Sequence, residues 1–549
     1  MPGMPAHSGH ASAHVDTFAH DCLPPPHALP ECLFDLPGLQ FPPRLNCATV
    51  LLDDAVARGE GGRLCIQGAG VRWTYADLLA QANRIAQVLV QQMGLVPGNR
   101  VLLRGANSPM LAACWFAVVK AGGIAVGSMP LLRARELQAI VQKAQISHAL
   151  CDGALADELQ AALPLSPTLK QLRCWGGELE TLAAAQSTHF ENTDTAAEDI
   201  CLIAFTSGTT GVPKGTAHFH RDVMAACACW PLHVLRPTRD DVFIGSPPLG
   251  FTFGLGGLLL FPMAVGASTV LVEKTAPEAL LQAIAQYAAT VCFTAPTSYR
   301  AMAGLLEKNT AQNMAQHDLH TLRKCVSAGE ALPAATRLLW KQASGIELID
   351  GIGSTEMLHI FISADEAQAR PGATGLPVPG YRAVVLDEHG HELPPGQVGR
   401  LAVKGPTGCK YLDDPRQADY VQNGWNLTGD AYLIDSDGQF VYQARTDDMI
   451  VSGGYNIAGP EVEAALLLHP AVAECGVVGQ PDEARGMVVK ACVVLKPGFD
   501  ANDLMAQALQ DFVKQTIAPY KYPRQIEFRS SLPRTETGKL QRFLLKQSG

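Results

Sequence analysis

A loop rich in glycine and hydroxyl residues reads Thr206-Ser207-Gly208-Thr209-Thr210-Gly211-Val212-Pro213-Lys214-Gly215 and directly follows an apolar run, residues 201–205. The apolar run predicts a buried strand. Glycines let a backbone approach an anion closely, hydroxyl and N–H groups donate hydrogen bonds, and Lys214 supplies positive charge. This strand and loop therefore indicate a triphosphate-binding site in an α/β fold.

The loop does not follow the Walker pattern, G-x-x-x-x-G-K-[ST]. Gly208 and Gly211 are too close together for that pattern, and Lys214 is followed by Gly215. The chain is therefore not predicted to be a P-loop NTPase. The alternative interpretation is a flexible Gly/Ser/Thr loop without a ligand.

Alternating helix and strand patterns precede the loop. Thr74 is a candidate cap for a helix with apolar residues on one face. Residues 101–103 predict a strand, Ser108 and Pro109 predict a helix start, and residues 124–126 predict the next strand. Such alternation favours mainly parallel sheets covered by helices. We expect an α/β fold with a large N-terminal multi-sheet body.

A second domain is expected near the C-terminus. The polar residues 444–448 predict a hinge, and strand patterns at residues 472–478 and 488–495 lie between two helix patterns. We predict three parts. They are a disordered N-terminal tail over residues 1–30, an N-terminal domain over residues 31–446 that carries the triphosphate-binding loop, and a small mobile α+β lid domain over residues 447–549.

The composition predicts a folded, soluble, cytoplasmic protein. Of its 549 residues 47% are apolar, and 42 Lys and Arg against 52 Asp and Glu give a net charge of −10, which disfavours nucleic-acid binding. Fifteen scattered cysteines without C-x-x-C spacing are typical of a reducing compartment. The first 20 residues lack a secretory signal pattern, and no apolar run approaches the roughly 18 residues of a membrane span. We expect a monomer or homodimer.

Four further motifs, together with the loop, resemble the adenylate-forming superfamily of acyl-CoA synthetases, peptide-synthetase adenylation domains and firefly luciferases. They are Gly351-Ile352-Gly353-Ser354-Thr355-Glu356, Thr428-Gly429-Asp430, Arg445-Thr446-Asp447-Asp448 and Pro533-Arg534-Thr535-Glu536-Thr537-Gly538-Lys539. The resemblance covers residues 45 to 545 and implies a multi-sheet α/β body with a mobile lid. The family commonly has an aromatic residue at the position of Ile352, so we expect altered adenine contacts.

The resemblance also implies roles for individual residues in a reaction that uses ATP, Mg²⁺ and coenzyme A. Catalysis would rest on Lys539, Thr355 and Glu356, and Glu356 would hold the metal ion. The phosphates would be bound by Thr206, Ser207, Gly208, Thr209, Thr210 and Lys214. The ribose would be bound by Asp430 and Arg445, and the adenine side would be formed by Gly329, Glu330, Asp350 and Gly351. Asp447 would be the hinge, and Ser452, Gly453, Gly454 and Tyr455 would line the CoA tunnel.

The acid is expected to be a small aromatic carboxylic acid. Residues 250–257 combine aromatic and small side chains, which suit a compact ring better than a long chain. Residues 350–361 resemble benzoate-CoA ligases, and residues 246–262 resemble ligases for 2-aminobenzoate. We expect the pocket to be lined by Phe251, Thr252, Phe253, Ala328, Gly353 and His359. Thr252 either bonds an ortho substituent or packs by its methyl group.

These features predict an aryl-acid CoA ligase for benzoate or 2-aminobenzoate. An aryl-acid adenylating enzyme that delivers to a carrier protein is the nearest alternative, and a luciferase-type monooxygenase is a second. A non-catalytic binding protein of the same fold is the alternative from another class. Such a protein would be expected to lose Lys539, Glu356 or Asp430, and all three are present.

Overall fold

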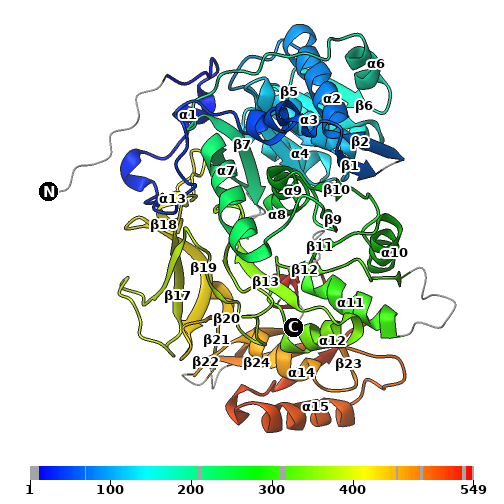
Figure 1. Ribbon diagram of the computed structural model, residues 1–549. Coiled ribbons are helices and arrows are strands. Elements are labelled where there is room, and N and C mark those ends of the chain that lie inside the picture. The colour runs from blue at the N-terminus through cyan, green and yellow to red at the C-terminus, as the bar shows by residue number, and fades with distance from the viewer. Residues whose placement is uncertain are drawn as a thin grey trace.

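The computed structural model describes residues 11–68, 70–206, 213–307, 317–452, 455–482, 486–534 and 540–546. In this part of the chain the strands form four sheets, three in a large N-terminal body and one in a small C-terminal domain (Figure 1). The expected α/β body with a small C-terminal α+β domain is confirmed.

Two mostly parallel sheets form the centre of the body. The first has the order β15 (Leu376–Pro377), β14 (Ile360–Ser363), β13 (Leu348–Gly353), β12 (Lys324–Ser327), β11 (Val291–Thr294), β9 (Val242–Gly245), β10 (Ser268–Val270), β1 (Leu64–Gly68), β2 (Val71–Thr74). The second has the order β6 (Gln171–Trp175), β5 (His148–Asp152), β3 (Arg100–Arg104), β4 (Ile124–Ser128), β7 (Ile200–Thr206), β8 (Lys214–Phe219). Antiparallel strands lie at the edges, as β8 does beside β7.

Two further sheets are smaller. The third sheet is antiparallel and contains β16 (Arg382–Leu386), β17 (Gly399–Lys404), β19 (Trp425–Ile434), β18 (Val421–Gln422) and β20 (Phe440–Arg445). The fourth contains β22 (Tyr455–Ile457), β21 (Ile450–Ser452), β24 (Gly486–Leu495), β23 (Val472–Asp482) and β25 (Gln525–Phe528). The fourth sheet has its own apolar core, as a separate domain requires.

The helices begin where the sequence predicts. Thr74 caps α2 through a capping box with Asp77, and Ser108 caps α3 with Pro109 at its first position. The helices are α1 (Phe18–Asp21), α2 (Tyr75–Gln87), α3 (Pro109–Lys120), α4 (Ala134–Lys143), α5 (Ala156–Ala162), α6 (Glu178–Ala184), α7 (His220–Ala228), α8 (Thr252–Leu255), α9 (Phe261–Val265), α10 (Pro277–Tyr287), α11 (Pro296–Glu307), α12 (Ala334–Ser344), α13 (Gln417–Tyr420), α14 (Gly459–Leu467), α15 (Asp503–Thr516) and α16 (Arg542–Lys546). Among the described residues, no helix combines the length and apolar character needed to cross a membrane.

The N-terminal segment differs from the expected disordered tail. Residues 11–30 pack on the body, and His14 is only 8% exposed. Asp16 pairs with Arg100 at 2.5 Å and accepts a hydrogen bond from Asn99 at 2.8 Å. The backbone N–H groups of residues 15 and 16 bond to the Pro97 carbonyl. The low apolar content of this segment suggested a tail, but its order comes from polar contacts that are distant in sequence.

The two domains meet near the expected hinge. The predicted boundary between residues 446 and 447 falls at η10 (Thr446–Asp448), which separates the last strand of the third sheet from β21. Helix α14 of the small domain packs against α12 and β20 of the body, and Figure 1 shows α12 and α14 side by side. Arg534 of the small domain reaches Glu330 of the body at 3.5 Å. The hinge role of Asp447 stays a prediction.

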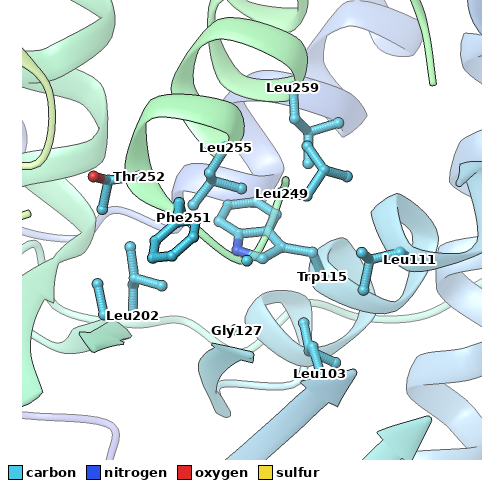
Figure 2. Close-up of a pocket in the computed structure, with 12 residues that line it drawn as sticks. Leu103, Leu111, Trp115, Gly127, Leu202, Leu249, Phe251, Thr252, Leu255 and Leu259 are labelled. Atoms are coloured by element: carbon cyan, nitrogen blue, oxygen red, sulfur yellow. The ribbon is translucent and has the colours of Figure 1, made fainter. Parts of the chain in front are cut away.

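Two backbone segments cross in close contact at the end of β4. A Cβ on Gly127 would lie 2.9 Å from the Gly250 Cα, and a Cβ on Gly250 would lie 2.7 Å from the Ser128 carbonyl oxygen. This contact places the start of α8 over the second sheet. A small cavity of about 20 Å³ lies beside it, between Trp115 of α3 and Leu255 (Figure 2). It has room for about one water molecule, and an aromatic acid does not fit there.

We predict that Gly250→Ala destabilises the protein by about 1–3 kcal/mol, because backbone atoms rather than a flexible side chain oppose the new methyl group. Gly304→Ala is the matched control, since Gly304 lies in α11 and a Cβ there meets nothing within 4 Å. The control should be stabilised by up to about 1 kcal/mol. Urea denaturation measures both variants. If Gly250→Ala were as stable as the parent, the close backbone contact between Gly250 and the end of β4 would be contradicted.

Candidate active site

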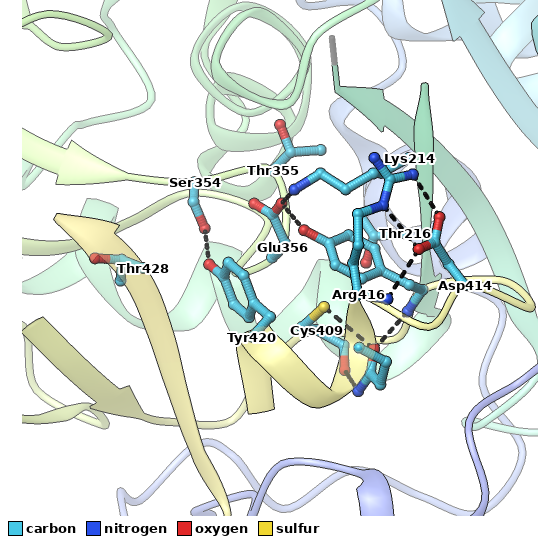
Figure 3. Close-up of polar contacts among 12 residues, drawn as sticks. Lys214, Thr216, Ser354, Thr355, Glu356, Cys409, Asp414, Arg416, Tyr420 and Thr428 are labelled. Carbon is cyan, nitrogen blue, oxygen red and sulfur yellow. Dashed lines mark hydrogen bonds and ion pairs between the residues drawn. The ribbon is translucent and has the colours of Figure 1, made fainter. Parts of the chain in front are cut away.

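Two residues from separate sequence motifs, Lys214 and Glu356, lie together in the structure (Figure 3). Lys214 Nζ is 3.9 Å from Glu356 Oε1, and the Glu356 side chain is buried. Lys214 begins β8, and Glu356 lies in the turn that follows β13, so each of the two central sheets supplies one charged group. Thr355 lies beside them and is partly exposed. A cation, a carboxylate and a hydroxyl are thus gathered at the junction of the two sheets.

Thr206 completes this group from the neighbouring strand. It ends β7 and is the cross-strand partner of Lys214. Its hydroxyl is buried and has no hydrogen-bond partner in the described part of the chain. A buried hydroxyl without a partner is costly unless a ligand supplies one. Thr206 and Lys214 therefore offer a donor and a positive charge at the same end of the sheet.

A segment of the third-sheet region holds Glu356 in place. The backbone of residues 410–412 runs beside β8 and pairs with it through N–H···O bonds of 2.8 and 2.9 Å. This pairing brings Tyr411 next to the site, where its hydroxyl donates a short hydrogen bond to Glu356 Oε1. Burial and the charge of Glu356 raise the pKa of Tyr411 above its ordinary range, so the hydroxyl stays neutral and donates. Lys214 Nζ lies 4.9 Å from the centre of the Tyr411 ring.

Two more side chains fix the backbone of the same turn. His218 Nε2 lies 2.9 Å from the Thr355 carbonyl oxygen, and because a carbonyl only accepts, Nε2 carries the proton. Burial lowers the pKa of His218 to about 4, so its ring is neutral. The hydroxyls of Tyr420 and Ser354 are 3.1 Å apart (Figure 3). The turn over residues 354–356 is thus held from the second sheet and from the third-sheet region at once.

The predicted ribose-binding pair is also assembled. Asp430 on β19 and Arg445 on β20 are direct cross-strand partners, with Arg445 Nη1 3.1 Å from Asp430 Oδ1. Arg445 donates a second bond to the Thr428 carbonyl at 3.0 Å. Gly429, which lies between Thr428 and Asp430 in the sequence, has a φ of +76°, and a Cβ there would lie 2.7 Å from Arg445 Nη2. The irregular stretch of β19 at residues 428–430 therefore requires glycine at position 429.

The predicted adenine side lies at the ends of β12 and β13. Asp350 and Gly351 are in β13, and Ala328, Gly329 and Glu330 directly follow β12, its parallel neighbour. Burial raises the pKa of the Asp350 carboxyl to about 7, although the charge of Arg337 opposes this shift. Asp350 Oδ1 has no hydrogen-bond partner within the described residues.

His359 lies in a cage of aromatic rings. The centre of its ring is 4.5 Å from that of Phe261, 5.6 Å from Trp230 and 5.7 Å from Phe253. Gly256 permits this packing, because a Cβ there would lie 2.4 Å from His359 Cδ2. The backbone of His359 also touches the motif turn, since a Cβ on Gly353 would lie 2.7 Å from its carbonyl oxygen. His359 thus contacts Phe253 through its ring and Gly353 through its backbone, and the pocket assignment of these three residues stays a prediction.

Neither nitrogen of the His359 ring makes a well-formed hydrogen bond within the described residues, although the Phe253 backbone lies near enough to oppose the shift of its pKa. Burial lowers its pKa to about 3, so it is a neutral imidazole with one donor and one acceptor. Phe251 and Thr252 lie at the start of α8 and line the small cavity, and Figure 2 shows the Thr252 hydroxyl pointing away from the leucines there. The pocket assignments of Phe251, Thr252 and Ala328 stay predictions.

Several predicted residues fall outside the description. Ser207, Gly208, Thr209, Thr210, Gly453, Gly454 and Lys539 lie outside the described residues, as do the side chains of Asp447 and Tyr455. The residues that flank 535–539, Arg534 and Leu540, pair as a β-bridge. Arg534 contacts Glu330, so this end of the small domain faces the residues predicted to form the adenine side. Ser452 is buried in the β21–β22 hairpin.

Sequence reasoning missed Tyr411, Tyr420 and His218. Each is an isolated aromatic residue without a motif, and each acts through a turn far away in the chain. The strand pairing of β8 with residues 410–412 reveals Tyr411, and the contacts with Ser354 and with the Thr355 carbonyl reveal Tyr420 and His218.

The sequence of this chain is similar to those of known enzymes over most of its length. The AMP-binding enzyme family matches residues 43–410, and the AMP-binding enzyme C-terminal domain matches residues 461–539. The benzoate–CoA ligase of Thauera aromatica is 36% identical over 521 residues, covering 93% of this chain and 98% of that protein.

Two solved structures extend the likeness to three dimensions. The anthranilate CoA ligase AuaEII in complex with anthranoyl-AMP has a TM-score of 0.88 at 34% identity, covering 93% of this chain and 99% of that chain. A benzoate CoA ligase from Burkholderia xenovorans LB400 has a TM-score of 0.83 at 32% identity, covering 92% and 100%. The chain belongs to the AMP-binding enzyme family, and within it to the adenylate-forming acid–CoA ligases, which use ATP and CoA.

Proposed function

We propose that the protein is a cytoplasmic aryl-acid CoA ligase, which activates benzoate or 2-aminobenzoate. The supporting observation is the aromatic cage around His359, which adjoins the turn that carries Thr355 and Glu356. A flat ring packs well against such side chains, whereas a long alkyl chain needs an extended tunnel. Relatives named for benzoate and anthranilate, which is 2-aminobenzoate, agree with this choice. The fifteen free cysteines suit a reducing compartment.

In the first step the acid's carboxylate oxygen attacks the α-phosphorus of ATP, an O–P bond forms, and pyrophosphate leaves. Negative charge accumulates on phosphate oxygens, so preorganised cations and donors lower the barrier. Thr355 would donate to the α-phosphate and Lys539 would neutralise it. Thr206, Lys214 and the loop residues 207–210 would bind the departing phosphates. Asp430 and Arg445 would hold the ribose.

Glu356 would hold Mg²⁺. The residues present fit this ion, because Mg²⁺ commonly takes one or two carboxylates and completes its shell with phosphate oxygens and water. The hydrogen bond from Tyr411 orients this buried carboxylate. When bound, the ion would neutralise charge on the phosphates.

In the second step the CoA sulfur attacks the acyl carbon of the aryl-adenylate, a C–S bond forms, and AMP leaves with the C–O bond electrons. Lys539 must leave the site for this step, so we propose a rotation of the small domain about Asp447. The residues Ser452, Gly453, Gly454 and Tyr455 would then line the path of the thiol. Arg534 at Glu330 is consistent with the small domain in its adenylation position.

We predict that pyrophosphate release from ATP with Mg²⁺ and CoA is fastest with benzoate or 2-aminobenzoate. The measurement compares these two acids with 2-hydroxybenzoate, cinnamate and octanoate, each with and without CoA. A small added polar group is weakly rejected by an apolar pocket, so 2-hydroxybenzoate should also react.

Each other outcome identifies a specific error. Release only with cinnamate or octanoate would contradict the pocket assignment while leaving adenylation intact. Turnover that CoA does not increase would favour delivery to a carrier protein. An absence of release with every acid would contradict catalysis and favour a binding protein.

We also predict a pH signature for the buried carboxyl of Asp350. Its pKa is about 7 when folded and about 3.8 when unfolded, so the folded state binds the proton more tightly. Asp350 therefore contributes up to about 4 kcal/mol to the free energy of unfolding. This contribution is fully present below about pH 4 and is lost as the pH rises to about 7. Asp350→Asn removes this loss. Urea denaturation between pH 5 and pH 8 should show that the free energy of unfolding of the parent decreases relative to that of the variant. If the two free energies change with pH in parallel, the raised pKa of Asp350 is contradicted.

A further inference from the structure

A second group of ligand-type side chains lies away from the active site, where the N-terminal segment meets the start of β7. His14 and His20 come from this segment, and Asp199 directly precedes β7; Figure 1 shows α1 beside that strand. One ligand atom of each of the three side chains lies within 4.8 Å of the other two. His14 and Asp199 are buried, and His20 is half-buried.

Three of the four imidazole nitrogens of this group make no hydrogen bond within the described residues. Both ring nitrogens of His14 and Nε2 of His20 are buried without a hydrogen bond in the described part of the chain. His20 Nε2 is 3.6 Å from Asp199 Oδ1, which is longer than a hydrogen bond. The two His14 nitrogens are buried without a hydrogen bond, and His20 Nε2 has only this longer contact with the carboxylate. Burial of such polar atoms carries a desolvation cost, which a bound ligand would offset.

The carboxylate is fixed in place by its surroundings. Asp199 Oδ2 accepts backbone N–H bonds from Ala13 at 3.0 Å and from Ala196 at 2.8 Å. Asp199 Oδ1 accepts from the Ser12 hydroxyl at 2.5 Å and faces His20. Such supporting bonds orient a ligand carboxylate before the metal arrives.

We propose that His14, His20 and Asp199 bind one Zn²⁺ ion, which fastens the N-terminal segment to β7. Two imidazoles and one carboxylate form a donor set that Zn²⁺ uses, with water in the fourth position. Bond lengths of about 2.0–2.2 Å place tetrahedral ligand atoms about 3.3–3.5 Å apart. The His20–Asp199 separation is 3.6 Å. All three ligand atoms lie within 4.8 Å of one another, so side-chain rotation would have to close any longer separation. The site is independent of the proposed ligase activity.

A neighbouring cluster, Cys47, Cys201 and His220, is a less suitable site. Its ligand atoms are also within 4.8 Å of one another and are fully enclosed. However, His220 Nδ1 already accepts the Cys47 backbone N–H at 3.1 Å, so its lone pair is occupied. A metal there would have to displace a buried hydrogen bond, whereas the three nitrogens of the His14 and His20 rings are available.

The test uses the full-length chain without an affinity tag, stripped with EDTA and titrated with Zn²⁺. We expect one bound equivalent and a rise in melting temperature, because the ion binds only the folded state. His14→Gln and His20→Gln should each weaken binding at least about 10-fold and abolish the rise in melting temperature. His389→Gln is the control, since His389 lies on an exposed hairpin with its side chain 72% exposed, and its binding should equal that of the parent.

Co²⁺ identifies the ligands independently of affinity. A visible spectrum of tetrahedral Co²⁺ without thiolate charge-transfer absorption in the near-ultraviolet supports the His14, His20 and Asp199 site. Strong thiolate absorption that disappears in Cys201→Ser would assign the metal to the other cluster and overturn the proposal. Failure of the parent to bind Zn²⁺, or unchanged binding in both histidine variants, would overturn it equally.

Discussion

The three-residue turn at positions 354–356 is the constraint on which the active site depends. Its middle carbonyl accepts from His218, its carboxylate accepts from Tyr411, and its serine contacts Tyr420. The first contact comes from the second central sheet and the other two from the third-sheet region. Parts of three sheets thus converge on one short piece of backbone, which leaves the groups that would face the α-phosphate and the metal ion little freedom to move.

Burial makes these contacts effective. Glu356, Tyr411 and His218 are buried, and charge-assisted hydrogen bonds strengthen where water is excluded. The ion pair of Lys410 and Asp222 lies behind them at 2.9 Å and anchors the segment that carries Tyr411. A charged pair of this kind is stabilising in place and costly to break by removal of one partner. The turn is therefore held by several buried contacts, and the domain rotation that we propose would take place at the hinge beyond Arg445.

Much of this architecture could be predicted from the sequence, because its signals are local. The caps Thr74 and Ser108 and the apolar runs of β3 and β4 specify helices and strands within a few residues. The motif residues Lys214, Glu356 and Asp430 could be found because the resemblance placed them in order. Contacts between residues that are distant in the sequence could not be predicted. The positions of Tyr411 beside β8 and of His14 beside Asp199 have no periodic or motif signal in the sequence. The N-terminal segment was misjudged for the same reason, since Asp16 is ordered by Arg100, which is far away in the sequence.

The most direct test of this account is exchange of labelled pyrophosphate into ATP in the absence of CoA, with benzoate or 2-aminobenzoate as the acid. The parent should exchange with either acid and not with octanoate. The exchange rate should fall by about 10- to 100-fold in Tyr411→Phe, because a hydrogen bond to a carboxylate is worth about 1.5–3 kcal/mol. The control variant Tyr287→Phe, in α10, should exchange at the rate of the parent. Exchange that needs no aromatic acid, or that is unchanged in Tyr411→Phe, would contradict the account.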